Sequence, residues 1–355
     1  MKIGLTGLPH SGKTTIFNAL TNAEVDVQAY ATEKTEPNLA VVAVADERVT
    51  RLSQMYGPKK TIHATIEMMD LGGMSHDPAK DSALSDQSIP LLKNADALAL
   101  VVRNYRDDLM GPPNPLADMS RVEEELLFSD LALCEGRLDR IEKSYQRGKK
   151  TPQLQVEEKI VRRILEQLNN EEPVRKLPMT KDEQKIIRGF QLLTEKPMMV
   201  VLNSNEMIFG DNQTLLDKIG KEYSVIEFAG KFEMELSRLD EEEMTLFMED
   251  MGVTESARDR LTRMAYRTLE YISFFTVGSD EVRAWTLKKG ETALDAAGTV
   301  HTDLARGFIR AECFSYDDLM ECRSEKGVKE KGRLRLEGKN YVVQDGDILN
   351  IRYNI

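Results

Sequence analysis

The stretch Gly7-Leu8-Pro9-His10-Ser11-Gly12-Lys13-Thr14 decides the fold of this chain. It has the Gly-x-x-x-x-Gly-Lys-Thr pattern of a phosphate-binding loop. The apolar run 3–5 before it indicates a strand, and the apolar residues of 16–20 after it indicate an amphipathic helix. Glycines let backbone N–H groups converge on phosphate oxygens, and a helix N-terminus adds partial positive charge. The stretch therefore predicts a phosphate site between a strand and a helix.

The loop supplies most of the nucleotide-binding residues that we expect. These are Gly7, Pro9, His10, Ser11, Gly12, Lys13, Thr14 and Thr15. Lys13 is expected to reach the terminal phosphates and to act in catalysis, and the Thr14 hydroxyl is expected to ligate Mg²⁺. The alternative is an ordinary glycine-rich turn with a chance lysine, which the spacing and the flanking elements disfavour.

A second motif supports the first. An apolar strand predicted over 62–69 ends in Asp70-Leu71-Gly72-Gly73, the Asp-x-x-Gly pattern. Its carboxylate holds magnesium through water and its glycine N–H senses the γ-phosphate, so Asp70 is a metal and catalytic candidate and Gly73 a catalytic one. Further apolar runs at 96–102 and 198–202 alternate with helical segments, which is typical of a parallel α/β sheet.

Composition limits the cellular setting. The chain has 355 residues, three cysteines and a formal net charge of -12. An odd number of widely spaced cysteines favours a reducing compartment, and no apolar run approaches the length of a membrane span. We expect a cytoplasmic protein. Its acidity disfavours non-specific binding to nucleic acid, so an RNA-bearing partner must meet a local basic patch.

Motifs along the whole chain resemble the YchF family, also called Obg-like ATPases. They are Gly7-Leu8-Pro9, Thr35-Glu36-Pro37-Asn38, Asp70-Leu71-Gly72-Gly73, Asn203-Ser204-Asn205-Glu206 and Glu281-Val282-Arg283-Ala284-Trp285. The resemblance implies an α/β P-loop NTPase domain of the G-protein type over 1–118 and 190–271. It also implies an inserted antiparallel helical hairpin over 119–189 and a C-terminal β-grasp (TGS) domain over 272–355.

The hairpin is also visible in the residue pattern. Apolar residues from Leu127 to Tyr145 recur at spacings of three and four, and Thr151-Pro152 gives a helix start before a second apolar stripe. The basic tip, residues 147–150, either contacts a phosphate-bearing partner or is a solvated turn. In the tail, short strands are predicted at 334–336, 341–343 and 348–353.

The segment Asn203-Ser204-Asn205-Glu206 occupies the place where a GTPase has Asn-Lys-x-Asp. A longer acid and a missing lysine fit guanine poorly, whereas amides that both donate and accept suit adenine. We therefore predict ATP in preference to GTP, bound by Asn203, Asn205 and Glu206. Phe228, Ala229 and Gly230 are expected to complete the pocket with backbone N–H groups. The alternative is that Asn203 only caps the strand end.

Catalysis is predicted to be slow. Met74 stands where small GTPases have the glutamine that orients water, and such missing groups are worth on the order of 10³ to 10⁵ in rate when an activator restores charge stabilisation. His76 is a candidate base, with a surface histidine as the alternative. Thr35 is a candidate second Mg²⁺ ligand. The family usually has asparagine at the position of His10 and threonine at that of Lys34, which puts potassium activation and the second ligand in question.

Three functions follow as hypotheses. The first is a slow ATPase switch that docks on the ribosome through the arm and the TGS domain, as the resemblance implies. The second is an Obg-type GTPase. The third is a nucleotide-sensing scaffold with little hydrolysis.

Overall fold

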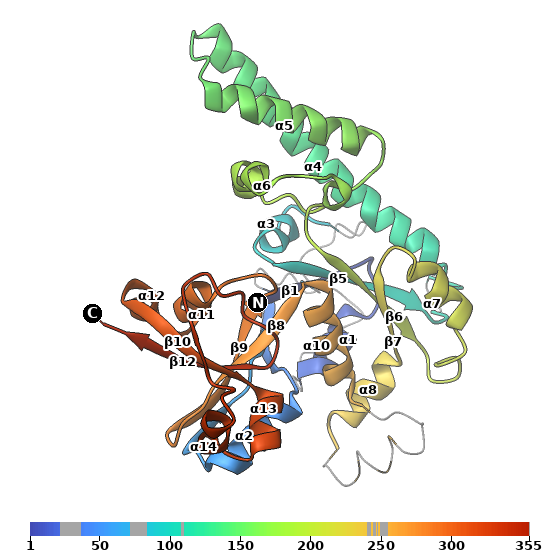
Figure 1. Cartoon of the computed structure of the whole chain (residues 1–355). Coiled ribbons are helices and arrows are strands. Elements are labelled where there is room, and N and C mark those ends of the chain that lie inside the picture. Colours follow the sequence, from blue (N-terminus) through green and yellow to red (C-terminus); the bar gives the residue numbers. More distant parts are fainter. Residues whose placement is uncertain are drawn as a thin grey trace. The chain divides into compact units, whose positions relative to one another are not determined.

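The computed structural model describes residues 1–21, 37–71, 84–107, 110–239, 243, 246, 248 and 255–354. The chain divides into two compact units, Met1–Val42 with Glu67–Arg260 and Ala43–Ile66 with Leu261–Ile355. Figure 1 labels their elements. The predictions made for Thr35, Gly73 and His76, and for Met74 beside them, lie outside the described residues.

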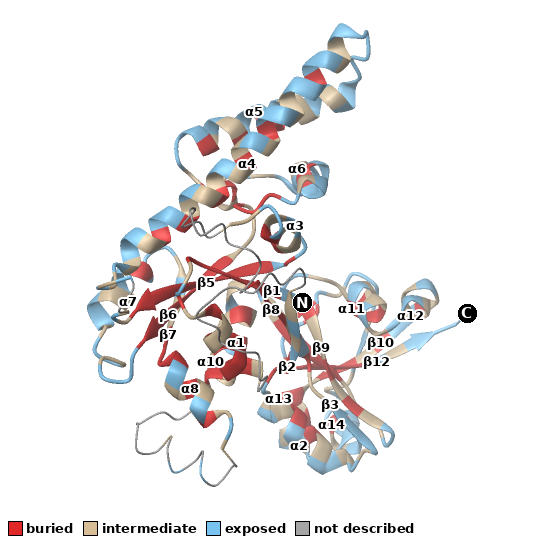
Figure 2. Ribbon diagram, turned by 180° about the vertical axis from the view of Figure 1, so that it is seen from behind, coloured by how far each residue is buried: buried red, intermediate tan, exposed pale blue. Residues whose placement is uncertain are grey.

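The first unit is built on a six-stranded sheet of order β2-β4-β1-β5-β6-β7. Its strands are β1 Lys2–Thr6, β2 Asn38–Ala43, β4 Thr65–Asp70, β5 Ala97–Asn104, β6 Met198–Ser204 and β7 Ser224–Phe228. β4, β1, β5, β6 and β7 run parallel to their neighbours. Every residue of β5 and β6 is buried, as Figure 2 shows in red. Continuous apolar runs are what a parallel sheet covered on both faces requires.

The parallel arrangement brings the predicted motifs to one edge of the sheet. Leu5 is paired with Asp70, Asn104 with Ser204, and Asn203 with Phe228. All of these residues lie at or next to the carboxyl ends of their strands, where parallel α/β sheets bind ligands. The fold itself therefore gathers segments as distant in the sequence as Leu5 and Phe228.

Helices complete the first unit. They are α1 Lys13–Thr21, α3 Ser88–Lys93, α4 Pro115–Gln146, α5 Pro152–Asn169, α6 Lys181–Ile187, α7 Gln213–Ile219 and α8 Gly230–Leu236, with 3₁₀ turns at Val174–Lys176 and Arg188–Phe190. The division between the units falls within α10, Ala257–Thr268. Among the described residues, no helix is both long and apolar enough to cross a membrane.

The predicted arm is formed by α4 and α5. α4 starts at the cap Asn114 and α5 at the cap Thr151, each with proline in its first turn. Figure 1 shows that the chain turns back after α4, so the two helices run antiparallel, and the ion pairs Arg137–Glu157 and Arg162–Glu142 connect them. The first turns of α4 do not belong to the hairpin. Met119, Val122 and Leu126 pack in the core of the sheet domain instead.

The second unit contains a sheet of order β11-β10-β12-β8-β9-β3. Its strands are β3 Lys60–Ile62, β8 Tyr271–Thr276, β9 Glu281–Lys288, β10 Phe308–Ser315, β11 Arg335–Glu337 and β12 Asp347–Tyr353, and its helices are α2 Glu47–Tyr56, α11 Ala293–Val300, α12 Thr302–Arg306, α13 Tyr316–Cys322 and α14 Glu325–Glu330. Ala293, Ala296 and Ala297 of α11 pack on the apolar face of this sheet. Small residues let the helix lie close to the strands.

Two segments differ from the sequence prediction. The strand predicted over 62–69 corresponds to β4, which starts only at Thr65, whereas Ile62 ends β3, which pairs with β9 in the second unit. Residues 43–66 thus cluster with the C-terminal residues, because Arg48 binds Asp345 and Tyr56 donates to Glu325. Residues 341–343 form only a single bridge, between Val342 and Thr292, and no strand. There the Ala293 N–H donates to the Tyr341 carbonyl, which fixes the segment to the start of α11.

Candidate functional site

The phosphate loop connects β1 to α1 and holds its lysine internally. The Lys13 Nζ donates to the carbonyls of Gly7 and Leu8, at 2.9 Å each. Lys13 is 8% exposed. Burial lowers the pKa of Lys13 to about 8, and the negative charge of Asp70 acts in the opposite direction. A phosphate group at this position would favour the charged ammonium.

The backbone of the loop needs its glycines. Gly7 has φ 143° and Gly12 has φ 90°, which are values that side chains disfavour. A Cβ on Gly7 would lie 2.4 Å from the carbonyl oxygen of Val101, and one on Gly12 would lie 2.1 Å from Nδ2 of Asn203. His10 has φ 57° although it is not a glycine. Where left-handed residues alternate with right-handed ones, successive backbone N–H groups point to the same side and form a concave site that binds anions.

A pair of oxygens lies at the start of α1. The Thr14 hydroxyl donates to Oδ2 of Asp70 at 2.9 Å, and Nδ2 of Asn38 donates to the same oxygen at 3.3 Å. Asp70 is fully buried. A hydroxyl and a carboxylate are the hard oxygen donors that Mg²⁺ accepts. The two predicted metal ligands that the structure describes are thus side by side.

Asn203 connects two loops. Its Nδ2 donates to the carbonyl of Ser11 at 3.0 Å, and its Oδ1 accepts from the N–H of Gly230 at 3.1 Å. Asn203 is 3% exposed. Its amide therefore bridges the phosphate loop and the start of α8, which neither of the two sequence interpretations described. An amide carries a second N–H, so this bridge leaves a donor for a base.

The other predicted base-binding residues take different positions. Asn205 and Glu206 are exposed, and Oδ1 of Asn205 accepts from the N–H of Ile208 at 3.1 Å. Phe228 is fully buried, and the Arg260 guanidinium lies 4.8 Å from the centroid of its ring. Ala229 is buried beside it, and Thr15 follows Thr14 on α1.

Sequence reasoning missed a buried polar network behind residues 203–206, the segment predicted to bind the base. The Ser204 hydroxyl donates to Glu227, and Nδ2 of Asn104 donates to Ser204 at 2.9 Å. Nδ2 of Asn212 donates to Oε1 of Glu227 at 2.6 Å, and the N–H of Gly210 to Oε2 at 3.1 Å. The network fixes both ends of the 205–212 loop. The sequence did contain one indication of this network. Glu227 lies in a mostly apolar strand, and a buried carboxylate needs hydrogen-bond partners.

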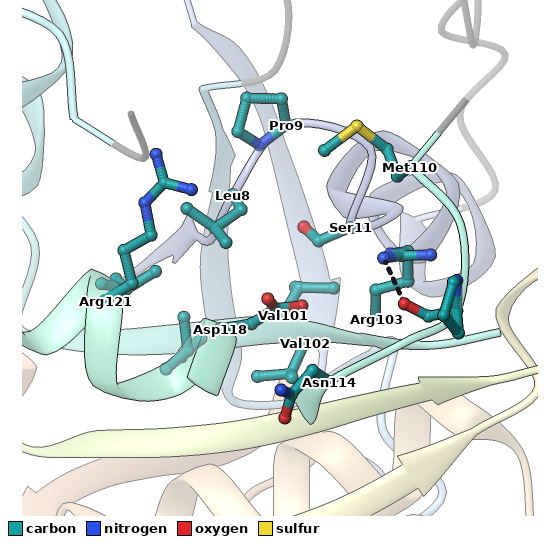
Figure 3. A pocket seen from close by; sticks show the side chains of 13 residues that line it. Leu8, Pro9, Ser11, Val101, Val102, Arg103, Met110, Asn114, Asp118 and Arg121 are labelled. Carbon is teal, nitrogen blue, oxygen red and sulfur yellow. Dashed lines mark hydrogen bonds between the residues drawn. The ribbon is translucent and has the colours of Figure 1, made fainter. Parts of the chain in front are cut away.

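A cavity of about 190 Å³ lies between the phosphate loop, the end of β5 and the start of α4. Figure 3 shows Leu8, Pro9 and Ser11 on one side of it, and Asn114, Asp118 and Arg121 on another. Lys13, Asp70 and Asn203 are not among the described residues that line it. The cavity therefore borders the first half of the phosphate loop but not these three residues.

The fold and the phosphate loop define a P-loop nucleotide-binding protein of the GTPase type. Residues 2–130 match the family described as "50S ribosome-binding GTPase", and residues 271–354 match YchF-GTPase_C, described as "Protein of unknown function". The predicted fold class is thereby confirmed.

Full-length relatives narrow this class. The "Ribosome-binding ATPase YchF" of Haemophilus ducreyi is 36% identical over 363 residues, covering 100% of this chain and 99% of that protein. The protein of the same name from Bacillus subtilis is 36% identical, with 99% of each covered. The solved Schizosaccharomyces pombe YchF GTPase has a TM-score of 0.85 at 29% identity, covering 99% of this chain and 97% of that one. This chain belongs to the YchF family.

Proposed function

We propose that this chain is an ATPase that binds ATP with Mg²⁺ at the phosphate loop. It hydrolyses ATP slowly and uses its nucleotide state to regulate association with the ribosome, in translation or the stress response. The observation that carries the proposal is the meeting of Lys13, Thr14 and Asp70 at one sheet edge. Relatives named ribosome-binding ATPases support the reaction and the partner.

Lys13, Thr14 and Asp70 each have a role in binding the triphosphate. Lys13 places an ammonium at the terminal phosphates, and Thr14 and Asp70 are the oxygen donors that would hold Mg²⁺. The metal, when bound, neutralises charge that develops on the β- and γ-phosphates. Thr35 as a further ligand, Gly73 as the γ-phosphate sensor and His76 as a base remain part of the proposal.

Adenine recognition is assigned to the end of β6 and the residues that follow it. Asn203 contributes its second N–H, Asn205 and Glu206 contribute exposed polar groups, and the N–H of Gly230 holds the Asn203 amide in place. Buried sites that hydrogen-bond a base discriminate strongly, because the wrong base leaves their groups unpaired. ATP is therefore the proposed substrate.

The ribosome contact is assigned to the arm and the C-terminal unit. The tip between α4 and α5, residues 147–150, carries three exposed cations for a phosphate-bearing partner. A ribosome-associated protein works in the cytoplasm, which is the proposed location. Without a glutamine at position 74, most turnover is expected only when the partner is bound.

Calorimetric titration with ATP and GTP in magnesium, followed by phosphate release with and without ribosomes, tests the proposal. We expect tighter binding of ATP and faster release with ribosomes. A preference for GTP would instead support a GTPase, which the name of the family matching 2–130 favours. Binding without release in either condition would leave a nucleotide-sensing scaffold.

A further inference from the structure

A tyrosine outside the motifs contacts the phosphate loop. Tyr105 directly follows β5, and its hydroxyl donates to the backbone carbonyl of His10 with an O···O distance of 2.7 Å. The same hydroxyl lies 3.7 Å from the position that a Cβ on Gly12 would occupy. Tyr105 therefore lies against the half of the loop that precedes Lys13.

The His10 peptide needs such a contact. With φ 57°, His10 has the left-handed conformation that residues with a Cβ seldom adopt without an external constraint. The His10 side chain is exposed, so packing does not hold it. The hydrogen bond from Tyr105 acts on the backbone itself.

Tyr105 is in turn held by a buried arginine. Arg103, 7% exposed, donates from Nη1 to the carbonyls of Tyr105 at 3.0 Å and Gly111 at 2.8 Å. Its Nη2 donates to the carbonyl of Pro112 at 3.3 Å, the bond dashed in Figure 3. Burial and the negative charge of Asp107 raise the pKa of Tyr105 while Arg103 opposes them, so its hydroxyl remains a donor at neutral pH.

We propose that Tyr105 is a positioning residue for the triphosphate: its hydroxyl holds the His10 peptide in the left-handed conformation that directs loop N–H groups to the phosphates. The inference rests on the proposed function, because it presumes that this loop binds a nucleotide. It acts on the phosphates and not on the base. ATP and GTP affinity should thus depend on it equally.

The test is a double-mutant cycle on the full-length chain, with ATP and GTP dissociation constants measured by calorimetry. Tyr105→Phe removes one oxygen and should weaken both nucleotides about fivefold to tenfold, the usual effect of one hydrogen bond. Glycine adopts positive φ without a steric penalty. Tyr105→Phe should therefore cost little or nothing when made together with His10→Gly. A role in packing alone would give the same loss in both backgrounds and would overturn the inference.

Tyr145→Phe is the matched control. It removes a hydroxyl that donates to Glu158 at 2.9 Å in the arm, and nucleotide affinity should not change. Unchanged affinity in Tyr105→Phe, with the wild type still binding ATP, would refute the positioning role and leave the proposed function intact. A wild type that binds no nucleotide would refute both.

Discussion

The phosphate side and the base side of the proposed site are built in different ways. On the phosphate side, one segment, 7–14, contains the lysine, the carbonyls that hold it and the hydroxyl that meets Asp70. On the base side, Asn203, Ser204, Asn212, Glu227 and Gly230 come from separate segments joined by side-chain hydrogen bonds. The first is a local motif and the second is a product of the tertiary fold. Affinity for phosphates and choice of base should thus be separable by mutation.

The largest effect is expected from the phosphate side. Lys13→Ala should abolish measurable ATP binding, a loss of at least about 100-fold, because a buried cation at the terminal phosphates disappears. Circular dichroism should show an unchanged fold. Lys185→Ala is the control, since that side chain is 75% exposed on α6. ATP binding that survives Lys13→Ala would remove the phosphate loop from the function.

Asn203→Ala removes the side chain that connects the phosphate side to the base side by hydrogen bonds. It removes the bonds to Ser11 and Gly230 and should destabilise the chain by about 2 kcal/mol, since two buried groups lose their partner. Affinity for both ATP and tripolyphosphate should fall by about tenfold, because this side chain supports the phosphate loop as well. Chemical denaturation and calorimetry measure the two losses. If tripolyphosphate bound normally, the two sides would be independent.

Asp130 holds the segment that leads into β6, at the opposite end of that strand from Asn203. Its carboxylate accepts from the N–H groups of Leu193 and Thr194 and from the Thr194 hydroxyl. Asp130→Asn puts an amide donor against these donors and should lower the unfolding free energy by about 2 kcal/mol at neutral pH. Denaturation at neutral pH tests this.

The same variant tests a pH effect. Burial raises the pKa of Asp130, and the hydrogen bonds from Thr194 and Leu193 offset this only in part. The folded chain then keeps this proton to a higher pH than the unfolded chain does, so this contribution to stability is full at lower pH and is lost as pH rises through the folded pKa. The unfolding free energy of the wild type relative to Asp130→Asn should therefore fall with rising pH above about 4, the unfolded pKa of aspartate. A difference independent of pH would contradict the raised pKa.

The smallest expected effect is on the choice between ATP and GTP alone. Ser204→Ala removes the hydroxyl between Asn104 and Glu227 and should change the ratio of ATP to GTP affinity by about threefold, because the 205–212 loop loses one of its anchors. Tripolyphosphate affinity should remain the same. An equal loss for all three ligands would show that the network supports the phosphate side instead.

What the sequence could predict follows the same division. The phosphate loop and Asp70 were predictable because strand, glycines, lysine and helix start are contiguous, and the sheet brings Asp70 beside Thr14. The bridging role of Asn203 was not, since its partners are 192 and 27 residues away. The Ser204–Glu227 contact likewise depends on which strands are neighbours. Local patterns predict elements, whereas side-chain partners across strands require the topology.

Because residues 43–66 belong to the second unit, the chain cannot be divided into its two units by a simple truncation. This segment leaves the P-loop sheet after β2, contributes α2 and β3 to the other unit, and returns as β4. A fragment ending near residue 270 would keep α2 and β3 but delete the strand and acidic side chains that they bind. Such a fragment would expose apolar surface and tend to aggregate, so its loss of activity would say little about the tail. To separate the P-loop unit from the C-terminal unit, residues 43–66 must be replaced with a short linker. The linker would join β2 to β4, two strands that are already connected by the hydrogen bond from Asn38 to Asp70.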